Sequence, residues 1–98
     1  MISRKLIRTD LNLLVALQIL LEERSVTRAA ERLSVSQPAL SKTLQKLRDS
    51  FEDELFTRTA HGLVPTPRAE ELAKELPSLL EKVEQVLGDE GFEPETFS

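Results

Sequence analysis

The sequence predicts a mainly α-helical fold, with three helices around one core, a small two-stranded hairpin and a long C-terminal helix. Apolar side chains recur at steps of three and four residues in several separate segments. Serine, threonine or aspartate stands before each of these segments, in two cases with a proline just inside, as is typical of helix starts. A chain of 98 residues without cysteine fits one small domain that needs no disulfide.

The first helix follows a short basic arm, residues 1–8. Thr9 or Asp10 can cap this helix, because an oxygen of either side chain can accept a free amide of the first turn. Over residues 11–21 the apolar side chains are so dense that they surround most of the helix. Such a helix must be covered on more than one side.

Two further helices are predicted on either side of a tight turn. Ser25 caps a short helix over residues 26–33, because its hydroxyl can accept a first-turn amide. Ser36 caps the next helix, which covers residues 36–50. Pro38 falls in its first turn, where the missing N–H costs nothing.

A hairpin and a long helix complete the predicted fold. Two short extended pieces within residues 55–64, namely residues 55–57 and 63–64, flank a polar tip that runs from Arg58 to Gly62, where Gly62 can adopt a positive φ. Thr66 and Pro67 then start a helix over residues 66–88. Its apolar residues are spaced by three and four over about two and a half heptads.

The order of the elements is helix, short helix, tight turn, helix, hairpin and long helix. Its middle part is a helix-turn-helix followed by a wing. We therefore predict four parts: a basic arm (1–8), a winged helix-turn-helix domain (9–65), a linker helix (66–88) and an acidic tail (89–98).

Charge is divided unevenly between the two halves of the chain. The formal net charge of −4 argues at first against a nucleic-acid partner. Residues 1–49, however, hold nine Lys and Arg against five Asp and Glu, whereas residues 50–98 hold four against twelve. A basic half joined to an acidic half indicates a separate role for each.

The helix over residues 36–50 carries the strongest binding signal. At about 100° per residue, its leucines share one side, and the opposite side is polar and partly cationic. We expect Gln37 at the helix tip and Lys42 on the outward side to reach base edges in a DNA major groove. The alternative is an ordinary solvated helix face, which the short preceding helix, the tight turn and the basic half disfavour.

Other polar residues of the same face are predicted to contact the DNA backbone. Hydroxyl groups, cations and the free amides of the first helical turn suit phosphate oxygens. The wing is expected on the backbone or in the minor groove, with His61 at its tip. The predicted backbone contacts are Thr27, Arg28, Ser36, Ser41, Gln45, Lys46, Arg58 and Thr59.

The apolar seam of the long helix has two interpretations. It can pack entirely against the first helix of the same chain, or it can pair with the same helix of a second chain. A chain this short cannot fully cover both the seam and the first helix, so we favour a homodimer, which also matches two half-sites on DNA. The predicted dimerisation residues are Leu72, Leu76, Leu79, Leu80, Val83 and Val86.

Several other functions are disfavoured. One histidine and no cysteine leave no His-based catalytic pair and no thiolate metal site, so we expect no enzyme, metal or cofactor. Carboxylates such as Glu52 and Glu54 stand on an open connection without a pocket that would raise a pKa. The longest apolar run, residues 13–17, is far shorter than a bilayer span. With no signal peptide apparent either, we expect a cytoplasmic protein.

Several motifs together resemble the N-terminal region of bacterial LysR-type transcriptional regulators. The resemblance covers about residues 9 to 87, and the A-A-x-x-L-x-V-S-Q-P-A-L-S run with a downstream L-F-x-R is highly specific for that family. The motifs are Asp10-Leu11-Asn12-Leu13-Leu14, Ser25-Val26-Thr27-Arg28-Ala29-Ala30, Leu33-Ser34-Val35-Ser36-Gln37-Pro38-Ala39-Leu40-Ser41, Leu55-Phe56-Thr57-Arg58-Thr59 and Gly62-Leu63-Val64-Pro65-Thr66-Pro67-Arg68-Ala69.

The resemblance implies regulation of transcription through sequence-specific binding of double-stranded DNA, with linker helices that pair in a dimer. By motif position it places Gln37, Pro38, Ala39 and Lys42 at bases, and Thr27, Ser36, Ser41 and Arg58 at phosphates. His61 falls at the wing tip, where many members carry Arg or Lys, and this departure weakens the minor-groove expectation.

The resemblance also implies a larger effector-binding domain that would begin near Phe92. We therefore expect an excised DNA-binding fragment or a naturally short relative, without a small-molecule effector of its own. In the full-length protein a tetramer is a further option.

One alternative stays open: a winged-helix interaction or oligomerisation module that binds no DNA. The negative net charge and the heptad seam favour it. Replacing Gln37 and Lys42 would then leave function intact, whereas changes at Leu76 and Leu79 would abolish it.

Overall fold

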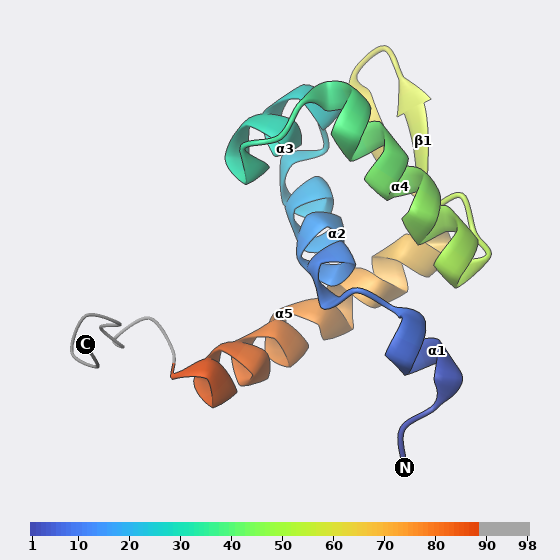
Figure 1. The fold of residues 1–98 in the computed structure, drawn as a ribbon. Helices are drawn as coiled ribbons and strands as arrows, with labels where there is room; N and C mark the ends of the chain where they lie inside the picture. The colour runs from blue at the N-terminus through green and yellow to red at the C-terminus, as the bar shows by residue number, and fades with distance from the viewer. Residues whose placement is uncertain (89–98) are drawn as a thin grey trace.

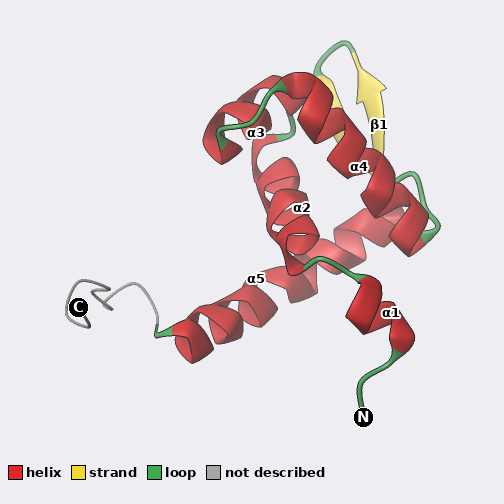
Figure 2. Cartoon of the chain, in the orientation of Figure 1, coloured by secondary structure: helices red, strands yellow, loops and turns green. Residues whose placement is uncertain are grey.

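A computed structural model describes residues 1–88, which form five helices and one two-stranded antiparallel sheet (Figures 1 and 2). In chain order the elements are α1 (Arg4–Arg8), α2 (Leu11–Glu23), α3 (Val26–Leu33), α4 (Gln37–Phe51), β1 (Phe56–Thr59), β2 (Gly62–Pro65) and α5 (Pro67–Leu87). The predicted winged helix-turn-helix with a long C-terminal helix is confirmed. The predicted acidic tail, 89–98, lies outside the described residues.

Helices α2 to α5 begin where the sequence predicts, because each capping side chain accepts a first-turn amide. Asp10, one of two candidates for α2, accepts from the backbone N–H of Asn12 at 2.9 Å. The caps of the three later helices each accept from the residue three positions ahead, at 3.2 Å. These caps are Ser25, Ser36 and Thr66.

The core lies where α2 meets α3, α4 and α5. Leu17 and Leu20 of α2 are completely buried, which confirms that this helix is covered on more than one side. Its N-terminal end is less covered, since Leu11 is 52% exposed. The wing joins the same core through Phe56 and Leu63, which are at most 5% exposed.

The structure departs from the predictions at the arm and in the hairpin. Residues 4–8 form a helix, α1, whose cap Ser3 accepts from the backbone N–H of Leu6 at 3.1 Å. Five residues are too few for a periodic signal, so the sequence predicts no helix there. Arg58 belongs to β1 rather than to the tip, and the register leaves only residues 60–61 as the turn.

Candidate nucleic-acid interface

The outward side of α4 is open to solvent, as predicted. Its leucines turn inward and are at most 2% exposed, which fixes the rotation of the helix about its axis. The four residues predicted to reach bases lie on the outward side or at the tip, and all are exposed: Gln37, Pro38, Ala39 and Lys42.

A hollow of about 200 Å³ brings three of the predicted contact elements together. Thr27 borders it from the start of α3, Gln37 from the tip of α4, and Arg58 and Thr59 from the wing. These side chains are far apart in the sequence, yet they surround one concavity. Helix α3, helix α4 and the wing therefore present one continuous surface.

The start of α4 offers fewer free amides than the sequence suggests. Ser36 Oγ already accepts from the backbone N–H of Ala39, and Pro38 has no N–H. Within residues 1–88, only the backbone N–H of Gln37 is left without an acceptor among those first-turn donors. Of the first-turn amides expected to suit phosphate oxygens, α4 therefore offers that of Gln37.

The start of α3 supplies free amides instead. Ser25 Oγ accepts from the backbone N–H of Arg28 at 3.2 Å, which leaves the N–H groups of Val26 and Thr27 without an intrahelical acceptor. Both residues line the hollow. Two free amides and the positive end of a helix dipole form a favourable environment for an anion.

The cations of this face are unpaired, whereas several cations elsewhere are engaged. Arg32 binds Glu22 at 2.7 Å and Glu23 at 3.0 Å, which ties α3 to α2. Hydrogen bonds from Gln18 and from Arg32 hold the pKa of the Glu22 carboxyl below its usual value. Four exposed cations, by contrast, take part in no ion pair within residues 1–88: Arg28, Lys42, Lys46 and Arg58.

The other predicted site residues have different surroundings. Gln45 Nε2 donates to Asp49 Oδ1 at 3.1 Å along the outward side of α4. Thr59 Oγ1 donates to the carbonyl oxygen of Gly62 at 2.9 Å and accepts from the N–H of His61 at 3.1 Å, so its hydroxyl shapes the wing turn. Ser41 is half-buried, whereas His61 is exposed at the tip.

The wing is held against the helix-turn-helix by a backbone contact that the sequence does not indicate. The N–H of Leu63 donates to the carbonyl oxygen of Arg24 at 2.9 Å. Gly62, beside this contact, has φ +113°, and a Cβ at this position would lie 2.5 Å from the same oxygen. The predicted positive φ at Gly62 is therefore confirmed. Glycine is also required because there is no room for a Cβ at this position.

The other end of the wing is fixed by Asp53. Its Oδ2 accepts from Thr66 Oγ1 at 2.7 Å and from the N–H of Leu55 at 2.8 Å. These hydrogen bonds, the one from Thr66 contributing most, hold the pKa of Asp53 below its usual value. Arg48 adds a donor to the carbonyl oxygen of Glu54 at 2.8 Å. The sequence predicts no role for these positioning residues, although Asp is a common turn residue because its side chain can accept from the backbone N–H two residues on.

The apolar seam of α5 is divided between the core and solvent. Leu76 is 3% exposed, and Leu72 packs partly against the core. Leu79 and Val86 are 45% and 86% exposed. The other two members, Leu80 and Val83, are half-buried. The interpretation in which one chain covers its whole seam is therefore wrong.

None of the helices within residues 1–88 is both long and apolar enough to span a membrane. No group of three or more Asp, Glu or His side chains in this range is arranged to hold a metal ion.

A capped helix with an outward polar face, a short helix before its tight turn and a hairpin beside both define a winged helix-turn-helix domain. The particular family follows from comparison: the family described as "Bacterial regulatory helix-turn-helix protein, lysR family" matches residues 11–70. The chain belongs to this family, which confirms the resemblance seen in the sequence.

The relatives of this chain include proteins that are named as transcriptional regulators. The chain is 51% identical over 78 residues to HTH-type transcriptional regulator SyrM 2 of Sinorhizobium fredii, an alignment that covers 80% of this chain and 23% of the relative. It is 58% identical over 64 residues to nodulation protein D 1 of Bradyrhizobium japonicum, covering 65% of this chain and 20% of that protein. The chain therefore spans about a quarter or less of the length of these relatives.

Solved structures with the same fold include one bound to DNA. A probable transcriptional regulator of Pseudomonas aeruginosa has a TM-score of 0.80 at 39% identity, over 87% of this chain and 28% of that one. The BenM DNA-binding domain in complex with the catB site 1 DNA has a TM-score of 0.76 at 29% identity, over 82% of this chain and 90% of that one.

Proposed function

We propose that the chain is the DNA-binding part of a LysR-type transcription regulator and binds double-stranded DNA sequence-specifically. Helix α4 enters the major groove, and the wing lies on the backbone or in the minor groove. The observation that carries the proposal is the set of exposed cations on α3, α4 and the wing that form no ion pair within residues 1–88, of which Arg58 borders the same hollow as Gln37. A polyanion would pair with these cations without breaking an ion pair of the protein.

The proposed base contacts come from the tip and the outward side of α4. Gln37 can donate and accept at the edge of an adenine, and Lys42 can donate to a guanine. Pro38 and Ala39 offer apolar contact to a thymine methyl group. All four are exposed.

The proposed backbone contacts centre on the hollow between α3 and the wing. A phosphate there would accept from the free N–H of Thr27 and from the Arg58 guanidinium, because both residues line the hollow. The hydroxyl hydrogen of Ser36 also stays available, since its Oγ only accepts within the cap. The remaining proposed contacts are Arg28, Ser41, Gln45, Lys46 and Thr59, with His61 facing the minor groove.

We further propose a homodimer through α5. Within residues 1–88, Leu79 and Val86 of the seam are exposed and Leu80 and Val83 are only half-buried, and a second copy of the helix would cover them. Leu72, Leu79, Leu80, Val83 and Val86 of the seam would line this interface, whereas Leu76 is 3% exposed and packs in the core of its own chain. Residues 1–8 then act as an arm, 9–65 as the DNA-binding domain, 66–88 as the linker helix and 89–98 as the start of an effector domain in a longer cytoplasmic protein.

Selection of bound DNA from a random library tests the proposal. We expect enrichment of a consensus with two-fold symmetry, because each protomer of a dimer presents one α4 to a half-site. Failure to enrich any sequence at low salt would contradict the proposal and favour an interaction module without DNA binding. Replacing both Gln37 and Lys42 with alanine should abolish the enrichment, whereas Lys74→Ala, on α5, should not.

A further inference from the structure

We propose that α1 belongs to the dimer interface, where its apolar side packs against the last turn of the partner's α5. This inference rests on the homodimer proposed above and adds a second contact to it. The proposed occupant of the α1 surface is thus a second copy of this chain.

Helix α1 is uncovered on its apolar side. Leu6 is 52% exposed and Ile7 is 72% exposed, and no residue of the helix is buried within residues 1–88. A helix of five residues gains little stability from its own hydrogen bonds. Its formation is therefore best explained by packing of this apolar side against another surface.

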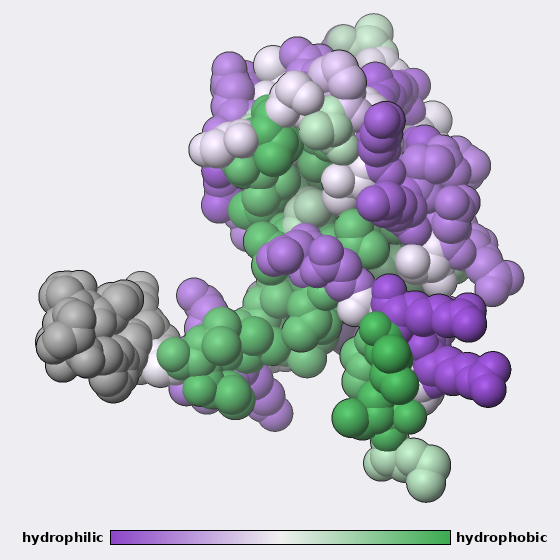
Figure 3. Space-filling view, viewed as in Figure 1, coloured by the Kyte–Doolittle hydropathy of each residue, from purple (hydrophilic) through white to green (hydrophobic). Residues whose placement is uncertain are grey.

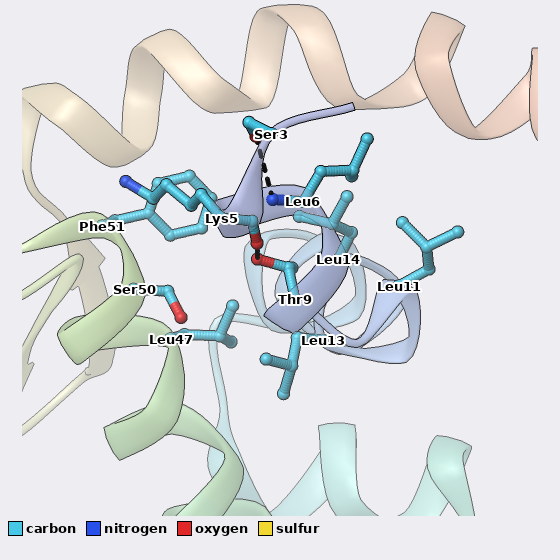
Figure 4. A pocket seen from close by; sticks show the side chains of 10 residues that line it. All are labelled: Ser3, Lys5, Leu6, Thr9, Leu11, Leu13, Leu14, Leu47, Ser50 and Phe51. Carbon is cyan, nitrogen blue, oxygen red and sulfur yellow. Dashed lines mark hydrogen bonds between the residues drawn. The ribbon is translucent and has the colours of Figure 1, made fainter. Parts of the chain in front are cut away.

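A hollow of about 300 Å³ adjoins this side of α1 (Figure 4). It lies between α1, the N-terminal end of α2 and the C-terminal end of α4. Its lining is mostly apolar, so an apolar side chain entering it would be removed from water at little cost. The apolar lining residues are Leu6, Leu11, Leu13, Leu14, Leu47 and Phe51.

The last turn of α5 has the matching character. Val86 and Leu87 are 86% and 74% exposed. Figure 3 shows apolar surface on α1 and on the second half of α5 on one side of the molecule. Each chain thus carries two uncovered apolar patches, one on α1 and one on the last turn of α5. In a two-fold symmetric dimer, the α1 patch of each chain would cover the α5 patch of the other.

The position of α1 fits an antiparallel pair of α5 helices. Figures 1 and 4 both place α1 beside the first half of α5. If two α5 helices cross antiparallel near Leu79, Val86 of one lies about 10 Å beyond the crossing, opposite the first half of the other. This is where the partner's α1 lies.

Charge supports the same arrangement. Arg4, Lys5 and Arg8 of α1 form no ion pair within residues 1–88, and neither do Glu81 and Glu84 of α5. Antiparallel pairing brings these opposite charges near one another. Exposed pairs of this kind add little affinity, but they favour this register over the parallel one, which separates them.

Cross-linking tests the contact directly, because the chain has no cysteine of its own. The I7C and V86C single variants of the full chain are mixed and oxidised with copper phenanthroline. We expect a disulfide-linked dimer that contains one copy of each variant. The V64C and V86C pair is the control, since Val64 is 49% exposed on the wing, away from both patches, and it should give no such product.

A third variant, L79C, separates this inference from the homodimer on which it rests. Self-linking of L79C without any I7C–V86C product would overturn the α1 contact and leave the α5 pairing in place. Absence of both products would overturn both. A DNA consensus with two-fold symmetry reports separately on DNA binding.

Sedimentation equilibrium provides the quantitative test. Ile7→Glu should raise the dimer dissociation constant by about tenfold or more, since it removes one buried aliphatic side chain from each of two symmetric contacts. Val64→Glu is the matched control and should leave the constant unchanged. An unchanged constant for Ile7→Glu would contradict the inference.

Discussion

Lys42 and Arg58 are both exposed cations of one face, but the proposed interface gives them different tasks. Lys42→Ala should lose discrimination between base pairs at particular positions, by about 1–3 kcal/mol, because it removes a donor to a base edge. Arg58→Ala should weaken all sequences alike, because it removes a phosphate contact. Competition binding with single-base variants of the selected site measures both effects.

Lys74→Ala is the control for this pair, since Lys74 is exposed on α5, away from the proposed DNA face. Lys74→Ala should change neither the discrimination between base pairs nor the affinity for DNA of any sequence. If Lys42→Ala weakened every sequence equally, its proposed base contact would be refuted.

Gly62 gives a prediction about stability. Gly62→Ala should lower the free energy of unfolding by about 1–3 kcal/mol, because φ is +113° and the new Cβ would collide with the carbonyl oxygen of Arg24. The strain would be relieved by moving the wing, so binding to DNA should weaken as well. Urea unfolding measures the first effect, and Ala60→Ser, at the exposed tip, should be neutral.

At the level of elements, the base of the wing is joined to the start of α5 by one carboxylate. Asp53 accepts from Thr66 and Leu55, and Thr66 also caps α5. Because the folded-state pKa of Asp53 is lowered, this group stabilises the fold above its unfolded pKa of about 4. That contribution is lost as the pH falls through the folded-state value.

Asp53→Asn should therefore lower the melting temperature at pH 7, and its difference from the unaltered chain should shrink below about pH 4. Melting curves at pH 7 and pH 3 measure this. Glu31→Gln, which replaces an exposed carboxylate without a hydrogen bond in residues 1–88, should show no such convergence. A constant difference across the pH range would argue against the Asp53 linkage.

The predictability of the elements follows from the range of the interactions that form them. Caps such as Ser36 and Thr66 act over three residues, and leucine spacing acts over one or two turns, so both are visible in the sequence. The contact of Leu63 with Arg24 joins residues 39 positions apart, and no local pattern announces it. For the same reason the outward face of α4 was predictable, whereas the free amides of α3 and their hollow were not.

At the scale of the whole molecule, we expect the affinity of the proposed dimer for DNA to fall steeply as the salt concentration rises. Arg28, Lys46 and Arg58 from two copies would neutralise about six phosphates, so the logarithm of the binding constant should fall with the logarithm of salt concentration at a slope of about −5. Fluorescence anisotropy over a salt series measures the slope. A slope near zero would show that phosphate contacts do not drive binding.

The dimer itself is tested by Leu79→Glu. A charge in the middle of the exposed seam should convert the chain to a monomer, and it should weaken binding to a two-fold site far more than to a single half-site. Sedimentation and binding to both DNA lengths give the result. An equal loss of affinity for the two-fold site and for the single half-site would contradict pairing through α5.

The uneven distribution of charge has a consequence for how the chain approaches its target. Four exposed cations without an ion pair lie on α3, α4 and the wing, namely Arg28, Lys42, Lys46 and Arg58, whereas five of the eight acidic residues within residues 50–88 lie along α5. The molecule therefore has an electric dipole moment, although its net charge has the same sign as DNA. In the field of a duplex this moment rotates the domain so that α4 leads during diffusion. This orienting torque fades once the Debye length, about 8 Å at physiological ionic strength, becomes shorter than the separation of the two charged regions.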